Sequence, residues 1–231
     1  MFNAYWFFVK MKIYIIDNHP LYIDSLATLL PVTHCENKIY KFTNSLTAVE
    51  QLDKDPIPDL IFINIHMPTL NGIDFLKTLE QRKTLSPVII LSDNNEDELL
   101  KELVNFDVSG LIPKAYTKEQ TLSALDKIFN GESYIPETVE LRLTRTKRLN
   151  NNLPENDTSI NALGVTRRQR EVLKLAAQGH PNKAIALLLN ISEHTVKSHI
   201  AAMFHLLHAK TRAECIQRAY ETGLIKPPGH N

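Results

Sequence analysis

The stretch DLIFINIHMPTLNG, residues 59 to 72, decides the fold. It opens with a short apolar run and continues into Pro, Asn and Gly, so it predicts a strand followed by a loop. A nearly continuous apolar run indicates a strand buried on both faces, as in a parallel sheet covered by helices. The run ends at Asn64, an amide at a place where a functional loop would be expected to carry an acid.

Further apolar runs occur before and after this strand, with amphipathic helical patterns between them. They lie at residues 12–16, 38–42, 87–91 and 108–112, and a helical segment over 118–130 closes the unit. Strands that alternate with helices predict an α/β, doubly wound, five-stranded parallel sheet. Because ligands gather at the carboxyl ends of such strands, the candidate site residues are Asp17, Asn18, Asn64, Ser92 and Lys114.

The last third of the chain has no strand pattern. Its apolar periodicity predicts four helices, at about 166–178, 182–189, 193–207 and 211–222. Thr166 and Gln169 have the spacing of a capping box for the first of them. The two middle helices are joined by the three-residue turn 190–192, with Ser192 as the expected N-cap, and this arrangement predicts a helix-turn-helix.

The charges are divided unequally along the chain. Residues 1–136 carry 12 Lys or Arg and 18 Asp or Glu, a formal −6, and the remaining residues carry 14 and 8, a formal +6. A basic second half is typical of a domain that binds a polyanion such as nucleic acid. Only Cys35 and Cys215 are present, and the apolar run at 4–9 is too short for a membrane span. We therefore expect a cytoplasmic protein with no membrane anchor.

These patterns divide the chain into a first domain at 11–134, a linker at 135–161 and a small all-α domain at 162–231. Residues 1–10 fit neither domain. Two interpretations of this extension stay open: an upstream miscalled start that is not native, with Met11 as the true start, or a short packing extension.

The second domain resembles the LuxR-type helix-turn-helix. The resemblance rests on about 55 residues, with ISEHTVKSH as the most diagnostic segment. It implies that Lys183, Thr195 and His199 contact the DNA backbone and that Lys197 and Ser198 face the major groove. For His199, packing inside the domain is an equal alternative. The sequence departs from the family pattern at Pro181, Ala184, Ala201, Leu206 and His208.

The first domain resembles the receiver domain of response regulators, which has a flavodoxin-like sheet, so the whole chain resembles the NarL/FixJ class. The matching segments are IIDNHPLY, DLIFINIHMPTLNG, VIILSD and SGLIPKA. In that family two acids bind Mg²⁺, a third Asp accepts phosphate, Ser or Thr and Lys contact the phosphate, and an aromatic side chain switches. Asp17, Ser92 and Lys114 match this pattern, whereas Asn18, Asn64 and Leu111 replace the second acid, the phosphoacceptor and the aromatic residue.

An amide has no anionic oxygen that could attack a phosphoryl donor, so Asn64 cannot form an acyl phosphate. Asp17 and Lys114 have opposite charges that sum to zero. We therefore expect direct contact between them, with Asn64 donating a hydrogen bond, and weak or absent Mg²⁺ binding. The site is thus interpreted as a degenerate phosphorylation pocket with no cofactor.

The predicted function is that of a transcriptional regulator that binds double-stranded promoter DNA as a homodimer and works without phosphorylation. Its control would lie in abundance, in a protein partner or in a small ligand at the receiver. Two alternatives stay open: a conventional phosphorylated two-component regulator, and an interaction protein that antagonises a partner regulator by heterodimerisation. An enzyme is not expected, because the pattern places no catalytic His beside Asp17, Ser92 and Lys114.

Overall fold

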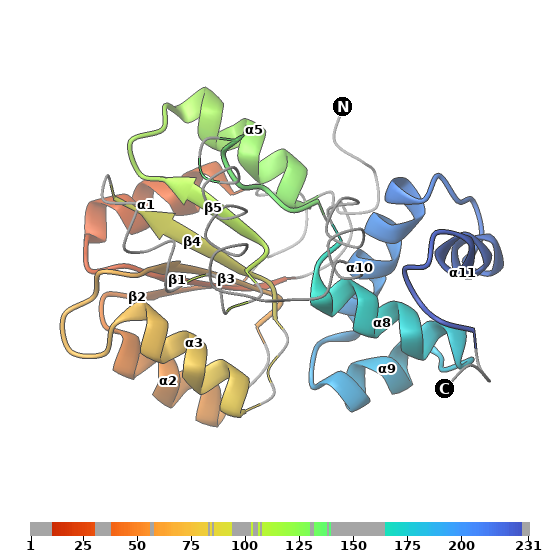
Figure 1. Cartoon of the computed structure of the whole chain (residues 1–231). Helices are drawn as coiled ribbons and strands as arrows, with labels where there is room; N and C mark the ends of the chain where they lie inside the picture. The colour runs from red at the N-terminus through yellow and green to blue at the C-terminus, as the bar shows by residue number, and fades with distance from the viewer. Residues whose placement is uncertain are drawn as a thin grey trace, which may run out of the picture.

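The protein is described from a computed structural model of the whole chain (Figure 1). The structure describes residues 11–30, 38–55, 58–82, 84, 86–93, 103, 106, 108–129, 132–137, 139 and 165–227. The extension at 1–10 and most of the linker at 135–161 lie outside these residues. The predictions made for these two segments therefore lie outside the described residues as well.

The first domain holds a single five-stranded parallel sheet, as predicted. Its strands lie in the order β2-β1-β3-β4-β5. Their bounds are β1 Lys12–Ile16, β2 Lys38–Phe42, β3 Leu60–Asn64, β4 Val88–Ser92 and β5 Gly110–Pro113. The central strands β3 and β4 are buried at every position, which explains their continuous apolar sequence.

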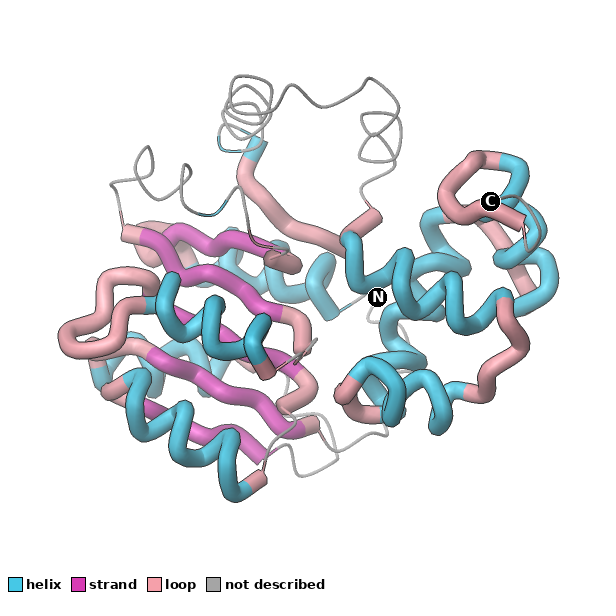
Figure 2. Tube along the Cα trace, turned by 60° about the horizontal axis from the view of Figure 1, so that its bottom comes forward, coloured by secondary structure: helices cyan, strands magenta, loops and turns pink. Residues whose placement is uncertain are grey.

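Helices cover both faces of this sheet (Figures 1 and 2). α2 (Ser45–Lys54) and α3 (Gly72–Gln81) pack on the face that includes Tyr14 and Ile63. α1 (Pro20–Leu29) and α5 (Lys118–Phe129) pack on the opposite face, against Ile13, Ile15 and Phe62. Alternate residues of each strand thus contribute to two separate cores, one on each side of the sheet.

The second domain consists of α8 (Arg167–Ala177), α9 (Asn182–Leu189), α10 (Glu193–Leu206) and α11 (Arg212–Glu221). The predicted capping box forms at Thr166 and Gln169, and Ser192 caps α10 by accepting from the amide of Thr195. Asn190 ends α9 in the left-handed conformation, at φ 51°, and this residue turns the chain between the two helices. The helix-turn-helix interpretation is therefore confirmed by the local geometry.

The two domains meet at the amino ends of the strands. In Figure 1 the strand arrows point away from the second domain, so the carboxyl ends lie on the far side of the sheet. Arg168 of α8 donates to the backbone carbonyl of Ser86, which precedes β4, at 2.6 Å. A five-residue strand is roughly 17 Å long. The degenerate pocket and the interdomain contact therefore lie at opposite ends of the same strands.

Candidate functional site

The degenerate pocket forms where β1, β3, β4 and β5 end. Asp17 follows β1 and is fully buried, and Lys114 follows β5 and is largely buried. Their charged groups lie 2.7 Å apart, which is the direct pair that the charge balance predicts. Lys114 also lies 3.7 Å from Asp93, which is half-exposed at the end of β4. A buried carboxylate is stable here because an ammonium group neutralises it.

Asn64 uses its side-chain amide in a local network. Its Nδ2 donates to Oδ1 of Asn18 at 2.8 Å and to the carbonyl of His66 at 3.2 Å. The same nitrogen lies 3.5 Å from Oδ1 of Asp17, and the Oδ1 of Asn64 accepts from the amide of His66 at 3.2 Å. The position that carries the nucleophile in a phosphorylated receiver is therefore filled by a hydrogen-bond donor.

His19 is a member of the pocket that sequence reasoning treated only as a loop histidine. Its Nδ1 lies 2.8 Å from Oδ1 of Asp17, and its backbone amide donates to the same oxygen at 2.9 Å. The signal that could have identified it is its spacing, two residues after a buried acid at a strand end. Tyr22 lies beside the pocket, with Lys114 5.4 Å from its ring centre, and burial raises the pKa of its hydroxyl to about 12.

The pocket residues do not fit a bound Mg²⁺. One oxygen of Asp17 contacts the ammonium of Lys114 and the other contacts His19. Asn18 and Asn64 bring amides where the family pattern has acids, and their amide groups are bonded to each other. In the described part of the chain, no cluster of three or more His, Cys, Asp or Glu could hold a metal ion. A hard divalent cation needs carboxylate oxygens that this arrangement does not offer.

The loop after Asn64 is held by close packing. The amide of Gly72 donates to the carbonyl of Ile65 at 2.9 Å. A Cβ at Gly72 would lie 2.7 Å from the Cα of Ile65 and 2.8 Å from the carbonyl oxygen of Asn64. Leu111, at the place of the switching aromatic residue, is buried in the core. The hydroxyl of Ser92 is buried and has no hydrogen-bond partner in the described part of the chain.

The predicted DNA-contacting residues divide into two groups. Lys183 and Lys197 are exposed and Ser198 is partly exposed, and Lys197 forms an i,i+4 ion pair with Glu193 at 3.0 Å. Thr195 and His199 are buried, with 2% and 5% of their surfaces accessible. The structure therefore leaves three of the predicted contacts accessible to DNA and covers two of them.

Thr195 is covered because the start of α10 binds an acid of the first domain. The hydroxyl of Thr195 donates to Oδ1 of Asp59 at 3.3 Å, and the hydroxyl of Ser192 contacts the same oxygen. Oδ2 of Asp59 accepts from the backbone amide of Lys12 at 2.8 Å. The amino end of a helix favours an anion, so a buried carboxylate is well placed here. Sequence reasoning missed Asp59, because its partners are far away along the chain.

The ring of His199 packs between α8 and the domain contact. Burial, and to a smaller extent the nearby positive charge of Arg168, lowers the pKa of this imidazole to about 3. Its Nε2 is buried and has no hydrogen-bond partner among the residues that the structure describes. Two interpretations were open for His199: contact with the DNA backbone and packing inside the domain. In the structure its side chain is packed inside the protein and is not on the surface of α10.

Comparisons with known proteins agree with this architecture. Residues 13–126 match the model of the response regulator receiver domain, and residues 164–219 match that of bacterial regulatory proteins of the luxR family. The nitrate/nitrite response regulator protein NarL of Escherichia coli K12 is 31% identical over 202 residues, covering 87% of this chain and 91% of NarL. The transcriptional regulatory protein YdfI of Bacillus subtilis is 28% identical, covering 93% of this chain and 97% of YdfI.

Solved structures show the same fold at lower identity. The RcsB response regulator in complex with DNA has a TM-score of 0.51 and 22% identity, covering 91% of this chain and 98% of that one. RcsB of Salmonella typhimurium has a TM-score of 0.50, also at 22% identity, covering 90% and 97% of the two chains. Among the described residues, no helix is long and apolar enough to cross a membrane. With both domain models matched in order, the chain belongs to the NarL/FixJ class of response regulators, which join a receiver domain to a LuxR-type DNA-binding domain.

Proposed function

We propose that this response regulator binds promoter DNA under a control that does not use phosphorylation of its receiver. The observation that carries the proposal is the hydrogen-bonded state of Asn64, whose Nδ2 donates to Asn18 at 2.8 Å. An amide cannot act as the phosphoacceptor. Lys114, which would contact a phosphate in the family pattern, is already paired with Asp17 at 2.7 Å. Among the described residues, the buried pair of Asp17 and Lys114 is neutral without phosphate or metal.

The interdomain contact suggests where control is exerted instead. In the structure the start of α10 faces Asp59, so Thr195 and His199 are not available to a DNA backbone. DNA binding through the whole of α10 requires the two domains to separate. We infer that the chain exchanges between this closed arrangement and an open one, and that DNA binds the open one. A ligand or partner acts by its different affinity for the two states.

In the open arrangement, Lys197 and Ser198 face the major groove and Lys183 contacts a phosphate. Lys197 has the length and charge to donate to guanine. Two copies of the domain read two half-sites, so the DNA-bound form is a homodimer. Sedimentation of the chain with and without a palindromic duplex measures this step, and a one-to-one complex of a monomer with that duplex would contradict it.

The experiment that tests phosphate-independence uses the full chain and a fluorescent duplex selected from a random pool. Binding is titrated by anisotropy before and after incubation with acetyl phosphate and Mg²⁺, and the protein is weighed by intact-mass spectrometry. The expected result is an unchanged Kd and no adduct of about 80 Da, the mass added by phosphorylation. A stoichiometric adduct together with a tighter Kd would show that the receiver is a conventional one.

A second function is favoured by the outer surface of α9. Leu187 and Leu188 are exposed at 77% and 59%, beside the helix that reads DNA. A contiguous apolar patch at the surface can mark a protein contact, and these two neighbouring side chains would form part of one. They favour the alternative that the chain antagonises another regulator by heterodimerisation. Weak binding to every duplex in the selected pool, together with a stable mixed dimer, would favour this alternative over the first.

A further inference from the structure

The single lysine of α10 is paired with an acid of the same helix. Lys197 is the only Lys or Arg in the segment Glu193–Leu206, and Glu193 lies one turn before it. Nζ of Lys197 and Oε1 of Glu193 are 3.0 Å apart. Their formal charges cancel, so this pair adds little to the sequence-independent attraction between the domain and DNA phosphates.

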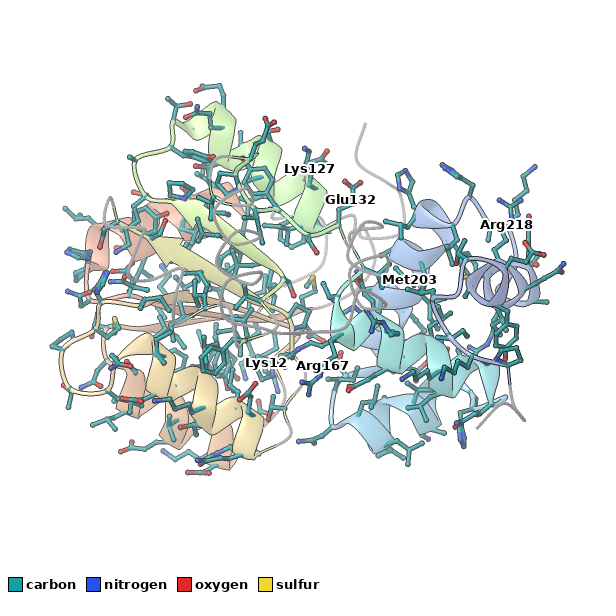
Figure 3. All side chains as sticks on the ribbon, viewed as in Figure 1. Lys12, Lys127, Glu132, Arg167, Met203 and Arg218 are labelled. Atoms are coloured by element: carbon teal, nitrogen blue, oxygen red, sulfur yellow. The ribbon has the colours of Figure 1, made fainter. Side chains whose placement is uncertain are left out.

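Both side chains of the pair are open to solvent. The accessible fraction is 59% for Lys197 and 45% for Glu193. Other side chains of the same helix, among them Val196 and Met203 (Figure 3), are buried in the second domain. Thr195 is covered by the first domain, but the pair is not. Glu193 and Lys197 therefore project together from the outward side of α10, even in the closed arrangement.

The pair lies where a helix-turn-helix reads sequence. Glu193 is the first residue of α10, and Lys197 begins its second turn. The amino-terminal residues of a recognition helix contact base edges in the major groove. The sequence pattern indicated Lys197 alone as a base contact and gave Glu193 no role. Because the two groups are one hydrogen bond apart, a base pair that meets the ammonium also meets the carboxylate.

A G·C pair offers groups that match this ion pair. In the major groove guanine presents the acceptors O6 and N7, and cytosine presents the donor N4. Within the base pair N4 donates to O6, and such a bond is about 2.9 Å long. The ammonium and the carboxylate of the protein are 3.0 Å apart. Lys197 can therefore donate to O6 while Glu193 accepts the second hydrogen of N4.

The other base pairs do not match in this orientation. Both A·T and C·G place a donor before the ammonium and an acceptor before the carboxylate. T·A has an acceptor and a donor in the right order, but its C5 methyl group takes the place of guanine N7. A charged group that loses its water and finds no partner is strongly unfavourable. The carboxylate thus rejects A·T and C·G, and the lysine rejects T·A.

We propose that Glu193 and Lys197 read one G·C pair as a unit, in which Lys197 donates to O6 and N7 of guanine and Glu193 accepts from N4 of cytosine. Glu193 is then a specificity-determining residue of the DNA-binding domain. The inference rests on the proposed function, which places Lys197 in the major groove. An exposed ion pair contributes little to stability, so its two members can turn toward a base pair at low cost.

The test uses the full chain and a duplex selected from a random pool. Each base pair is replaced in turn, and the position at which Lys197→Ala loses most discrimination identifies the guanine. Its partner is then replaced by N4-methylcytosine, which still pairs but lacks the free N4 hydrogen. By anisotropy, this change should raise the Kd of the unchanged chain at least about fivefold and leave that of Glu193→Ala unaltered. No rise in the unchanged chain, or an equal rise in both proteins, would overturn the proposal.

Glu171→Ala is the matched control. Glu171 forms an i,i+4 ion pair with Arg167 of α8 (Figure 3) at 3.6 Å, so the variant removes the same charge from the same domain. Its response to N4-methylcytosine should equal that of the unchanged chain. Each response is a ratio of two Kd values for one protein, so an altered balance of the closed and open arrangements cancels. A control that also loses the response would attribute it to net charge and overturn the proposal.

A duplex of unselected sequence separates base reading from a structural role of Glu193. Glu193→Ala should bind this duplex about twofold more tightly, because it removes a negative charge near the phosphates. Weaker binding of this variant to both duplexes would indicate a damaged helix and overturn the proposal. If the chain selects no duplex, the proposed function fails together with this inference. If it selects one and no position responds to Lys197→Ala, or the methylated cytosine has no effect, DNA binding stands and only this inference is overturned.

Discussion

The hydroxyl of Thr195 lies 3.3 Å from a carboxylate oxygen of Asp59, 136 positions earlier in the chain. Ser192, the N-cap of the same helix, contacts that oxygen too. The amino end of α10 is where a helix-turn-helix meets the DNA backbone. A carboxylate and a phosphate are both anionic acceptors, so Asp59 occupies in the closed arrangement a place that a phosphate would occupy on DNA. The two anions compete for one set of donors.

Replacing Asp59 should therefore increase the affinity for DNA. Asp59→Asn keeps the size of the side chain but removes its charge, and it weakens the contact with Ser192 and Thr195. Hydrogen bonds to charged groups contribute more than neutral ones, so we expect the Kd for DNA to fall about fivefold, equivalent to about 1 kcal/mol. Anisotropy titration of the full chain measures it. The control is Asp24→Asn, at a half-exposed ion pair with Lys41, and an equal change in both variants would exclude competition by Asp59.

Restoring acids to the pocket should restore phosphorylation only when two of them return. Asn64→Asp alone places a carboxylate against Oδ1 of Asn18, which now accepts from Asn64 at 2.8 Å, and it supplies too few acids for Mg²⁺. The double variant Asn18→Asp, Asn64→Asp supplies the acceptor and a second metal ligand. Intact-mass analysis after incubation with acetyl phosphate and Mg²⁺ should show an adduct of about 80 Da in the double variant alone. Full modification of the single variant would show that Asn18 does not limit the reaction.

Breaking the pair of Asp17 and Lys114 should destabilise the first domain. Asp17 is fully buried, so Lys114→Met leaves a buried carboxylate without its cation. The free energy of unfolding should fall by about 3 kcal/mol, as measured by urea denaturation. Adding Asp17→Asn to Lys114→Met should recover part of the loss, because it removes the unpaired charge. Lys41→Met breaks an exposed pair and should cost less than about 1 kcal/mol, and an equal loss in both single variants would show that the burial of Asp17 is not decisive.

His199 should make the stability of the chain depend on pH in the acid range. Its folded pKa of about 3 lies below its ordinary value of 6.5, so between these values the unfolded chain binds a proton that the folded chain does not. The contribution of the neutral His199 to the free energy of unfolding is complete above pH 6.5 and is lost as the pH falls toward 3. The slope is about 1.4 kcal/mol per pH unit at most. Urea denaturation at pH 7 and pH 5 measures how far the free energy of unfolding falls between the two pH values. This fall should be smaller for His199→Gln than for the unchanged chain, and identical falls would exclude a neutral His199.

The sheet and the pocket could be predicted because each depends on a local pattern. Apolar runs bounded by Gly, Pro or polar residues give the strands, and the strand ends give Asp17, Asn64, Ser92 and Lys114. A strand boundary differs from the prediction where tertiary packing sets it. β5 begins at Gly110, two residues later than the apolar run at 108–112 suggests. A Cβ at Gly110 would lie 2.9 Å from the carbonyl oxygen of Tyr134, so this position depends on a segment that follows α5.

The contact between the domains could not be predicted in the same way. Within its own segment, each contact residue is ordinary: Asp59 precedes a strand, and Ser192 and Thr195 lie at the start of a helix. No sequence pattern links residues that are so far apart in the chain. His199 lies at a spacing that suits both a DNA contact and a buried ring. The three-dimensional structure decides between the two, because the side chain of His199 is buried, with 5% of its surface accessible.

The packing at Gly72 affects which substitutions in the pocket this protein can accept during evolution. Close contacts with the backbone of Asn64 and Ile65 fix the loop, and none of these contacts depends on a charge in the pocket. The conformation of the loop therefore does not depend on whether the pocket residues are acids or amides. An Asn codon and an Asp codon differ by a single base, so the two acids needed at Asn18 and Asn64 are two base changes away for a lineage that carries this loop.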